Sequence, residues 1–201
     1  MQLPMLFSGG LIAYALALKN NPQLNNYIMT HLEGRQQTVA NIIKNYAAFV
    51  REGETNYGTP WQYLVGIIYK ESKGLTPPYG SQQVAPGLWG TPEAYHQSAF
   101  PSGTPKKYWS SYGLMQVSWL TAGKEMGLVS KPEDLMDPRR NILAGAAVLK
   151  SKYNVYGDWN KAVMAYNGTP NTSVTLAYLS EVVLAVNDIN VLAGSRPSGY
   201  A

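Results

Sequence analysis

Cysteine is absent from the 201-residue chain, and histidine occurs only twice, at His31 and His96. The lack of cysteine excludes disulfides and any chemistry that needs a thiolate. The two histidines form neither a His-Glu-x-x-His motif nor a close pair, so the sequence predicts no zinc site. A Gly-x-Ser-x-Gly elbow and a glycine-rich phosphate loop are also missing. We therefore expect neither a metal nor a cofactor.

Charged residues make up only 14% of the chain, and the formal net charge is +4. Lysine and arginine are scattered along the sequence, and the tightest pairs are Lys106 with Lys107 and Arg139 with Arg140. A nucleic-acid groove needs a denser basic stripe, so we expect no nucleic-acid partner. A weak positive charge is suited to approaching an anionic polymer such as a bacterial cell wall.

A mostly apolar run occupies residues 3–18. It is shorter than the roughly 20 residues that a membrane-spanning helix requires. No lysine or arginine precedes it, although Ala15-Leu-Ala17 resembles a signal-peptide cleavage site. Three interpretations stay open for this run: a helix packed on the rest of the protein, an anchor in a membrane or envelope assembly, and a signal peptide.

Helical periodicity recurs along most of the chain, whereas no alternation typical of β-strands is sustained anywhere. We therefore predict a mainly α fold in one medium-sized domain with an N-terminal helical arm. Asp137, which Pro138 follows, and Asp158 are expected to cap two of the helices. The expected helices span residues 22–51, 59–72, 137–152, 158–167 and 173–189.

Residues 74–110 interrupt this helical pattern with frequent prolines and glycines. The segment also contains aromatic residues such as Trp89, Tyr95 and Tyr108, a content that argues against disorder. Flat aromatic faces suit stacking on sugar rings, although the same rings could pack the segment onto the body of the protein. We expect a long loop insertion here, with at most short helical turns.

Glu71 lies on the apolar face of the expected helix at residues 59–72, after Leu64, Ile67 and Ile68 at helical spacing. The end of an apolar stripe disfavours the charged form of a carboxylate, which raises its pKa. A carboxylic acid that keeps its proton near neutral pH can act as a general acid. The alternative is a solvated glutamate at a frayed helix end, which is where most helical glutamates lie.

The start of the same helix is marked by Thr59, Pro60 and Gln62. Together they predict a Thr-x-x-Gln capping box with proline at the first helical position. The phase of the helix, and with it the placement of Glu71 on the apolar face, is therefore well defined.

The remaining inventory of a carboxylate, tyrosines and amides fits cleavage of a glycosidic bond. Between residues 60 and 183 the chain contains, in order, Glu71-Ser72, Gly113-Leu-Met-Gln-Val117, Asp137-Pro-Arg-Arg-Asn-Ile-Leu-Ala-Gly145, Gly157-Asp-Trp-Asn-Lys-Ala-Val-Met-Ala-Tyr-Asn-Gly168 and Tyr178-Leu-Ser-Glu-Val-Val183. In this order and at these spacings the motifs resemble the catalytic domain of soluble lytic transglycosylases, which share the goose-type lysozyme fold.

The resemblance implies a helical domain with a groove that binds the glycan strand of peptidoglycan. The single catalytic glutamate of the family falls on Glu71, the residue that the helical phase selects. The other family motifs place substrate-binding or supporting residues along the groove at Ser72, Gly113, Gln116, Tyr166, Asn167 and Tyr178.

The family mechanism implies that Glu71 protonates the oxygen linking MurNAc to GlcNAc and then takes a proton from the C6 hydroxyl of the same MurNAc. The product is a 1,6-anhydro sugar. A hydrolysing glycosidase ordinarily needs a second carboxylate. The candidates resemble loop, cap or surface positions, although folding could bring Glu93 to the groove; they are Glu93, Glu125, Glu133, Asp134 and Asp137. We favour the transglycosylase and keep two alternatives, a lysozyme-type muramidase and a non-catalytic wall-binding or virion protein.

We predict an N-terminal helical arm at residues 1–56, a catalytic domain at residues 57–192 and a flexible tail at residues 193–201. The insertion at residues 74–110 replaces a short segment of the family pattern and should shape one wall of the groove. The expected partner is the peptidoglycan glycan strand, so the protein should act at the bacterial cell wall or periplasm. The apolar N-terminal arm fits either a phage virion or an envelope-spanning secretion assembly.

Overall fold

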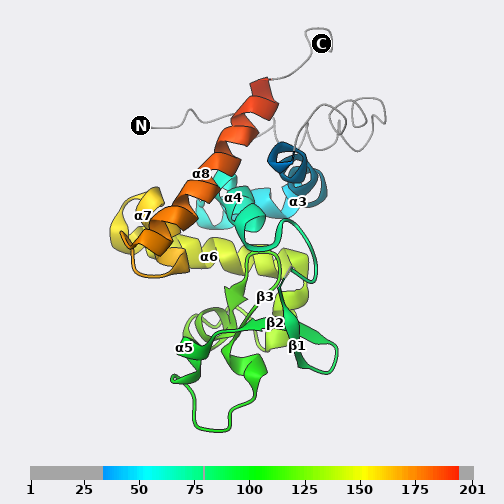
Figure 1. Cartoon of the computed structure of the whole chain (residues 1–201), viewed down its shortest axis with the longest axis vertical. Coiled ribbons are helices and arrows are strands. Elements are labelled where there is room, and N and C mark those ends of the chain that lie inside the picture. Colours follow the sequence, from blue (N-terminus) through cyan, green and yellow to red (C-terminus); the bar gives the residue numbers. More distant parts are fainter. Residues whose placement is uncertain (1–33, 79, 195–201) are drawn as a thin grey trace.

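The computed structural model describes residues 34–78 and 80–194, and its fold is mainly helical, as the sequence predicts. The apolar run at residues 3–18, His31 and residues 195–201 of the expected tail lie outside the described residues. Figure 1 shows the long helices in the upper part of the molecule and a small sheet below them. The helical elements are α3 (Arg35–Tyr57), α4 (Trp61–Ser72), α5 (Ala94–Gln97), η1 (Lys106–Trp109), the π-helical η2 (Leu120–Glu125), η3 (Pro132–Met136), α6 (Pro138–Tyr156), α7 (Trp159–Asn167) and α8 (Ser173–Gly194).

Helix α4 lies at the centre of the core because its sequence is apolar on almost every face. Leu64, Ile67 and Ile68 have no exposed surface. Helices α3, α6 and α8 pack around α4, and burying each such side chain contributes about 1.5–3 kcal/mol. The stripe that the sequence predicts is therefore a buried face, and Glu71 lies at its end.

The two predicted aspartate caps are confirmed. The Asp137 carboxylate accepts a hydrogen bond at 2.8 Å from the backbone N–H of Arg140 at the start of α6. The Asp158 carboxylate accepts an equivalent bond, also at 2.8 Å, from the backbone N–H of Lys161 at the start of α7. These caps satisfy backbone donors that have no partner within the helix.

The capping box predicted at Thr59 is wrong. Helix α4 begins at Trp61 without a side-chain cap, and the buried Thr59 hydroxyl donates instead to the backbone carbonyl of Ala146 in α6 at 3.0 Å. The Thr59 side chain thus bonds to a neighbouring helix and does not cap the first turn of its own helix. Thr59 therefore ties the start of α4 to α6.

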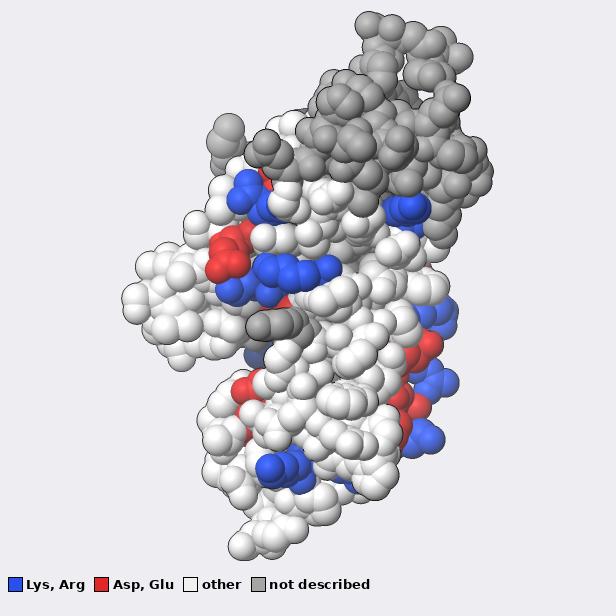
Figure 2. Space-filling model, turned by 45° about the vertical axis from the view of Figure 1, so that its right-hand side comes forward, with Lys and Arg blue, Asp and Glu red and all other residues white. Residues whose placement is uncertain are grey.

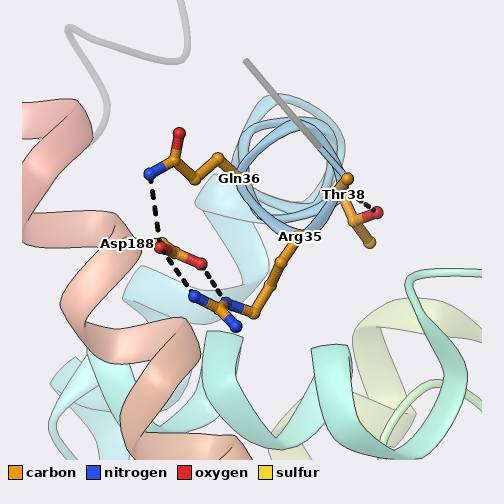
Figure 3. Close-up of polar contacts among 5 residues, drawn as sticks. Arg35, Gln36, Thr38 and Asp188 are labelled. Carbon is orange, nitrogen blue, oxygen red and sulfur yellow. Dashed lines mark hydrogen bonds and ion pairs between the residues drawn. The ribbon is translucent and has the colours of Figure 1, made fainter.

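The first turn of α3 is fixed to α8 through Asp188, which is 4% exposed. The Arg35 guanidinium forms an ion pair with this carboxylate, and Gln36 Nε2 lies 3.5 Å from Asp188 Oδ1. Figure 3 shows both side chains converging on Asp188 between the two helices. A buried carboxylate needs such partners to offset its loss of hydration, so α3 and α8 are joined at a defined point.

Helix α8 is longer than the sequence predicts, and residues 193–194 of the expected tail belong to it. By length and composition alone its stretch Ser173–Leu192, with a mean hydropathy of 1.3, is apolar enough to cross a membrane. The helix packs on α3, α4 and α7, and Tyr178 and Val182 belong to the core. This packing accounts for part of its apolar composition, since 39% of the stretch is buried.

The segment predicted to be a loop insertion contains strands, which corrects that prediction. Strands β1 (Gln82–Ala85) and β2 (Leu88–Pro92) form an antiparallel hairpin, and β3 (Ser110–Tyr112) and β4 (Val117–Ser118) extend the sheet in the order β1-β2-β3-β4. Strands of two to five residues are too short to show alternation. The hairpin turn uses Gly87 at a φ of 72°, so this glycine marks a turn within a sheet.

Candidate active site

Glu71 lies in the last turn of α4, where the apolar stripe of the helix ends. The hydroxyl of Tyr178, from α8, donates a hydrogen bond to its Oε1 at 2.6 Å. Burial raises the pKa of Glu71 to about 7; this hydrogen bond and the charges of Lys70 and Lys73 lower it, and the charge of Glu93 raises it. Near neutral pH the carboxyl is present in both forms, so it can donate a proton and later accept one.

Two tyrosines from different helices, the buried Tyr178 and the partly buried Tyr166, support this side of the site. Tyr178 is 3% exposed, and Tyr166 of α7 donates a hydrogen bond from its hydroxyl to the Met115 carbonyl at 2.9 Å. Burial and the nearby Glu71 charge raise the pKa of both phenols well above the ordinary value for tyrosine. Both side chains therefore stay neutral hydrogen-bond donors, and Tyr178 is the one that contacts the acid.

The Gly113-Leu-Met-Gln motif forms a turn between β3 and β4. Gly113 has a φ of 70°, and a Cβ at this position would lie 2.3 Å from Nδ2 of Asn141, so only glycine fits. The buried Asn141 donates to the carbonyls of Tyr112 and Leu135 and accepts from the N–H of Met115. One side chain of α6 therefore holds the turn in place against the helices.

A cleft of about 660 Å³ lies between the helices and the sheet. Helices α4, α6 and α7 line one wall, and β3, β4, α5 and η2 line the other. Its opening is visible on the left of Figure 2, between the upper and the lower part of the molecule, with acidic and basic side chains near its rim. Four of the predicted site residues line this cleft: Glu71, Gln116, Tyr166 and Asn167.

The other three predicted site residues, Ser72, Gly113 and Tyr178, lie behind the cleft surface. Ser72 is 1% exposed; its hydroxyl donates to the Ile68 carbonyl at 3.1 Å and accepts from the N–H of Gly74 at 3.2 Å. These bonds close the end of α4 directly after Glu71. The positions of Ser72, Gly113 and Tyr178 therefore suit support of the site better than direct contact with a ligand.

The sheet wall carries groups that the sequence analysis did not select as site residues. Glu93 follows β2 and lines the same cleft as Glu71, the outcome that the sequence left open. Burial raises the pKa of Glu93, while a hydrogen bond with the Ser111 side chain lowers it. The cleft therefore holds two carboxyl groups. No local sequence signal identifies Glu93, because its position depends on how the hairpin packs.

His96 and Ser118 are further members of this wall that sequence reasoning missed, and Tyr95, one of the aromatic residues noted in residues 74–110, lies there too. His96 Nδ1 lies 3.2 Å from the Ser118 hydroxyl, and its ring contacts that of Tyr95, with centroids 4.1 Å apart. Burial lowers the pKa of His96, although the charge of Glu125 raises it. Aromatic faces beside hydrogen-bonding groups suit a sugar ligand. Within the described parts of the chain, no group of three or more Asp, Glu or His could hold a metal ion.

Comparison with known proteins gives two matches that bear on this site. A family model described as the transglycosylase SLT domain matches residues 48–175, a range that includes Glu71 and ends before Tyr178. A protein named transglycosylase from Enterobacteria phage PRD1 is 37% identical over 87 residues, which cover 41% of this chain and 30% of that protein. The match thus spans under a third of the relative's length. No solved structure matches the chain.

Proposed function

Because the chain belongs to the family of the transglycosylase SLT domain, we propose that it is a lytic transglycosylase that cleaves the glycan strand of peptidoglycan. In this proposal it breaks the bond between MurNAc and GlcNAc and leaves a 1,6-anhydroMurNAc end. The observation that carries the proposal is Glu71, a carboxyl group with a pKa of about 7 in a cleft of the size used for small ligands.

Glu71 acts twice in the proposed reaction. The protonated carboxyl donates its proton to the glycosidic oxygen, and the bond from that oxygen to C1 of MurNAc breaks. The resulting carboxylate then takes the proton of the C6 hydroxyl of the same MurNAc, and O6 forms the new bond to C1. Glu71 ends protonated again and no water is consumed, so one carboxyl group is sufficient.

The neighbouring polar groups support these two steps in the proposal. Tyr178 donates to Oε1 of Glu71 and so favours the carboxylate that forms after the first transfer. Gln116 and Asn167 line the cleft and offer amides to the sugar hydroxyls and N-acetyl groups. Tyr166 lines the same space, while its hydroxyl is held by the Met115 carbonyl.

The proposal is tested by the products that the protein releases from purified peptidoglycan. In water labelled with heavy oxygen, transglycosylation adds no solvent oxygen to the new MurNAc end, whereas hydrolysis adds one atom, so mass spectrometry separates the two reactions. Glu71→Gln is expected to lower the rate at least about a hundredfold. Glu52→Gln, a matched change at an α3 residue outside the cleft, should keep full activity. Lytic activity in Glu71→Gln equal to the wild type would remove Glu71 from the chemistry.

A lysozyme-type muramidase is the second candidate, and Glu93 is the observation that favours it. A hydrolase uses a second carboxylate to activate water or to stabilise the positive charge that develops at C1. Glu93 lines the cleft with a raised pKa, so a second carboxyl group is available. Reducing MurNAc ends that carry solvent oxygen, lost in Glu93→Gln, would select this candidate over the transglycosylase.

The setting that we propose is the bacterial cell wall, since the substrate is found there. The PRD1 relative is a phage protein, which favours a virion component over an envelope-spanning secretion assembly. The apolar run at residues 3–18 would then contact that assembly. A non-catalytic wall-binding role predicts that the wild-type protein binds peptidoglycan and releases no fragments, so the product assay tests this alternative as well.

A further inference from the structure

The last turn of α6 brings a lysine and two exposed apolar side chains to the cleft. Val155 and Tyr156 come three and four residues after Lys152, so both lie on the same face of the helix as Lys152. Val155 is 74% exposed and Tyr156 is 41% exposed. Large apolar side chains exposed beside a cleft are typical of a surface that a ligand covers.

Lys152 differs from the lysines next to Glu71 in having no ion-pair or hydrogen-bond partner among the residues that the structure describes. Lys70 forms an ion pair with Glu181 at 2.7 Å, and the ammonium of Lys73 lies 3.6 Å from the ring centroid of Tyr69. Within residues 34–78 and 80–194, the Lys152 side chain makes no ion pair and no hydrogen bond. It is therefore available to an anionic group of a ligand.

Lys152 is also absent from the charges that set the pKa of Glu71, although both residues line the cleft. The charges that act on the pKa of Glu71 are those of Lys70, Glu93 and Lys73. Among the described residues that line the cleft, Lys152 is the one lysine, and no arginine is present. Its position suits recognition of the substrate rather than proton transfer.

We propose that the last turn of α6 is a subsite for the peptide stems of the glycan, in which Lys152 binds a stem carboxylate while Val155 and Tyr156 pack on aliphatic parts of the peptide. The inference rests on the proposed function, because it takes peptidoglycan as the substrate. Peptide stems combine free carboxylates with small aliphatic side chains, and this combination matches a cation beside two apolar residues. The enzyme would then favour glycan strands that still carry their stems.

Binding measurements with the Glu71→Gln protein, which is expected to turn over the ligand at least about a hundredfold more slowly, test the subsite. Three forms of one tetrasaccharide of alternating GlcNAc and MurNAc serve as probes: with native stems, with the stem carboxyls converted to amides, and without stems. Titration calorimetry should give about fivefold tighter binding of the native form than of the amidated form at low salt. The added change Lys152→Gln should bring the native form to the level of the amidated form and leave the amidated form unchanged.

Lys161→Gln, on the surface of α7 outside the cleft, is the matched control and should keep the fivefold difference. Val155→Asn should weaken both stem-bearing forms and leave the form without stems unchanged. The probe without stems has free lactyl carboxylates. A Lys152 dependence as large for that probe as for the native form would identify the lactyl group as the anion and overturn the proposal. The proposal would also be overturned if Lys152→Gln lowered the affinity for all three probes equally, or if it left the affinity for the native form unchanged.

Activity separates this proposal from the proposed function. If the wild-type protein releases no fragments but the Lys152-dependent difference persists, the proposed function fails and the subsite stands. Suppose instead that the wild type forms anhydro products, and that Lys152→Gln does not change the ratio of its rates on strands with stems and on strands without them. The proposed function then stands and the subsite fails. If both hold, Lys152→Gln should raise KM for stem-bearing strands about fivefold with an unchanged kcat.

Discussion

The two walls of the cleft differ in how firmly they hold their functional groups. On the helical wall Glu71 is bonded to a tyrosine that is 3% exposed, at the end of a helix that three other helices surround. On the sheet wall Tyr95 is 68% exposed, and Glu93 and His96 are only partly buried. An apolar, well-packed wall can raise the pKa of an acid, whereas exposed groups are free to meet a ligand. The difference fits the proposed reaction, in which the helices set the proton chemistry and the sheet adds groups that can contact the substrate.

Asn141 is the side chain by which the helices hold the turn of the sheet wall. We expect Asn141→Ala to lower the free energy of unfolding by about 4 kcal/mol, because it leaves the buried partners of three hydrogen bonds unpaired. Urea denaturation followed by circular dichroism measures this change. Asn154→Ala, at an exposed position of the same helix, should have little effect. Equal urea midpoints for the two variants would show that the walls are joined elsewhere.

The burial of Glu71 should cost the protein stability above neutral pH. Its pKa rises from the ordinary 4.5 to about 7 on folding, so the folded state binds the proton more tightly. Stability therefore falls as the pH rises from about 4.5 to 7, and the full cost, on the order of 3 kcal/mol, is present above pH 7. Glu71→Gln removes it.

We expect Glu71→Gln to be more stable than the wild type at pH 8 and to lose this advantage at pH 4. Glu93→Gln is the comparison on the sheet wall, and it should show a smaller gain because Glu93 is less buried. Thermal unfolding at the two pH values measures both. A larger gain in stability for Glu93→Gln than for Glu71→Gln would contradict the view that the helical wall buries its carboxyl group more than the sheet wall does.

The sequence predicted the helical wall well because its signals are local. The spacing of Leu64, Ile67, Ile68 and Glu71 depends only on the helical repeat, and the burial of these three apolar residues confirms the stripe. The caps at Asp137 and Asp158 also involve neighbours in the chain. Thr59 is the exception, because its hydroxyl found a partner in α6 that only the folded structure provides.

The sheet wall could not be predicted in the same way. Its strands are too short to show a period, and the register that brings Glu93 beside Ser111 comes from pairing between segments that are far apart in the chain. The sequence did predict that Gln116 lies in the groove, but this prediction came from the Gly113-Leu-Met-Gln motif and not from the spacing of apolar residues. The roles of all these residues in the reaction stay predictions.

Removing the Tyr178 hydroxyl tests how the helical wall tunes the acid. Its hydrogen bond to Oε1 lowers the pKa of Glu71, so Tyr178→Phe should raise that pKa. Because the first step needs the protonated acid, activity is lost as the pH rises through this pKa. The alkaline limb of kcat/KM should move up by about one pH unit.

Tyr166→Phe is the matched control for this prediction. Tyr166 also belongs to the helical wall, where it is partly buried, but its hydroxyl donates to the Met115 carbonyl and makes no hydrogen bond to Glu71. It should change the alkaline limb much less than Tyr178→Phe. If both variants gave the same profile, the hydrogen bond to Oε1 would have no part in setting the pKa.

Glu93→Gln tests whether the sheet wall also takes part in the proton chemistry. The Glu93 charge raises the pKa of Glu71 through space, after the larger effect of burial. Its removal should lower that pKa and move the alkaline limb of kcat/KM down by a few tenths of a pH unit, with anhydro products retained. Glu125→Gln, which changes a charge that acts on His96, should leave the limb in place. If Glu93→Gln instead abolishes cleavage, the sheet wall takes part in the chemistry and two carboxyl groups share the reaction, as in a hydrolase.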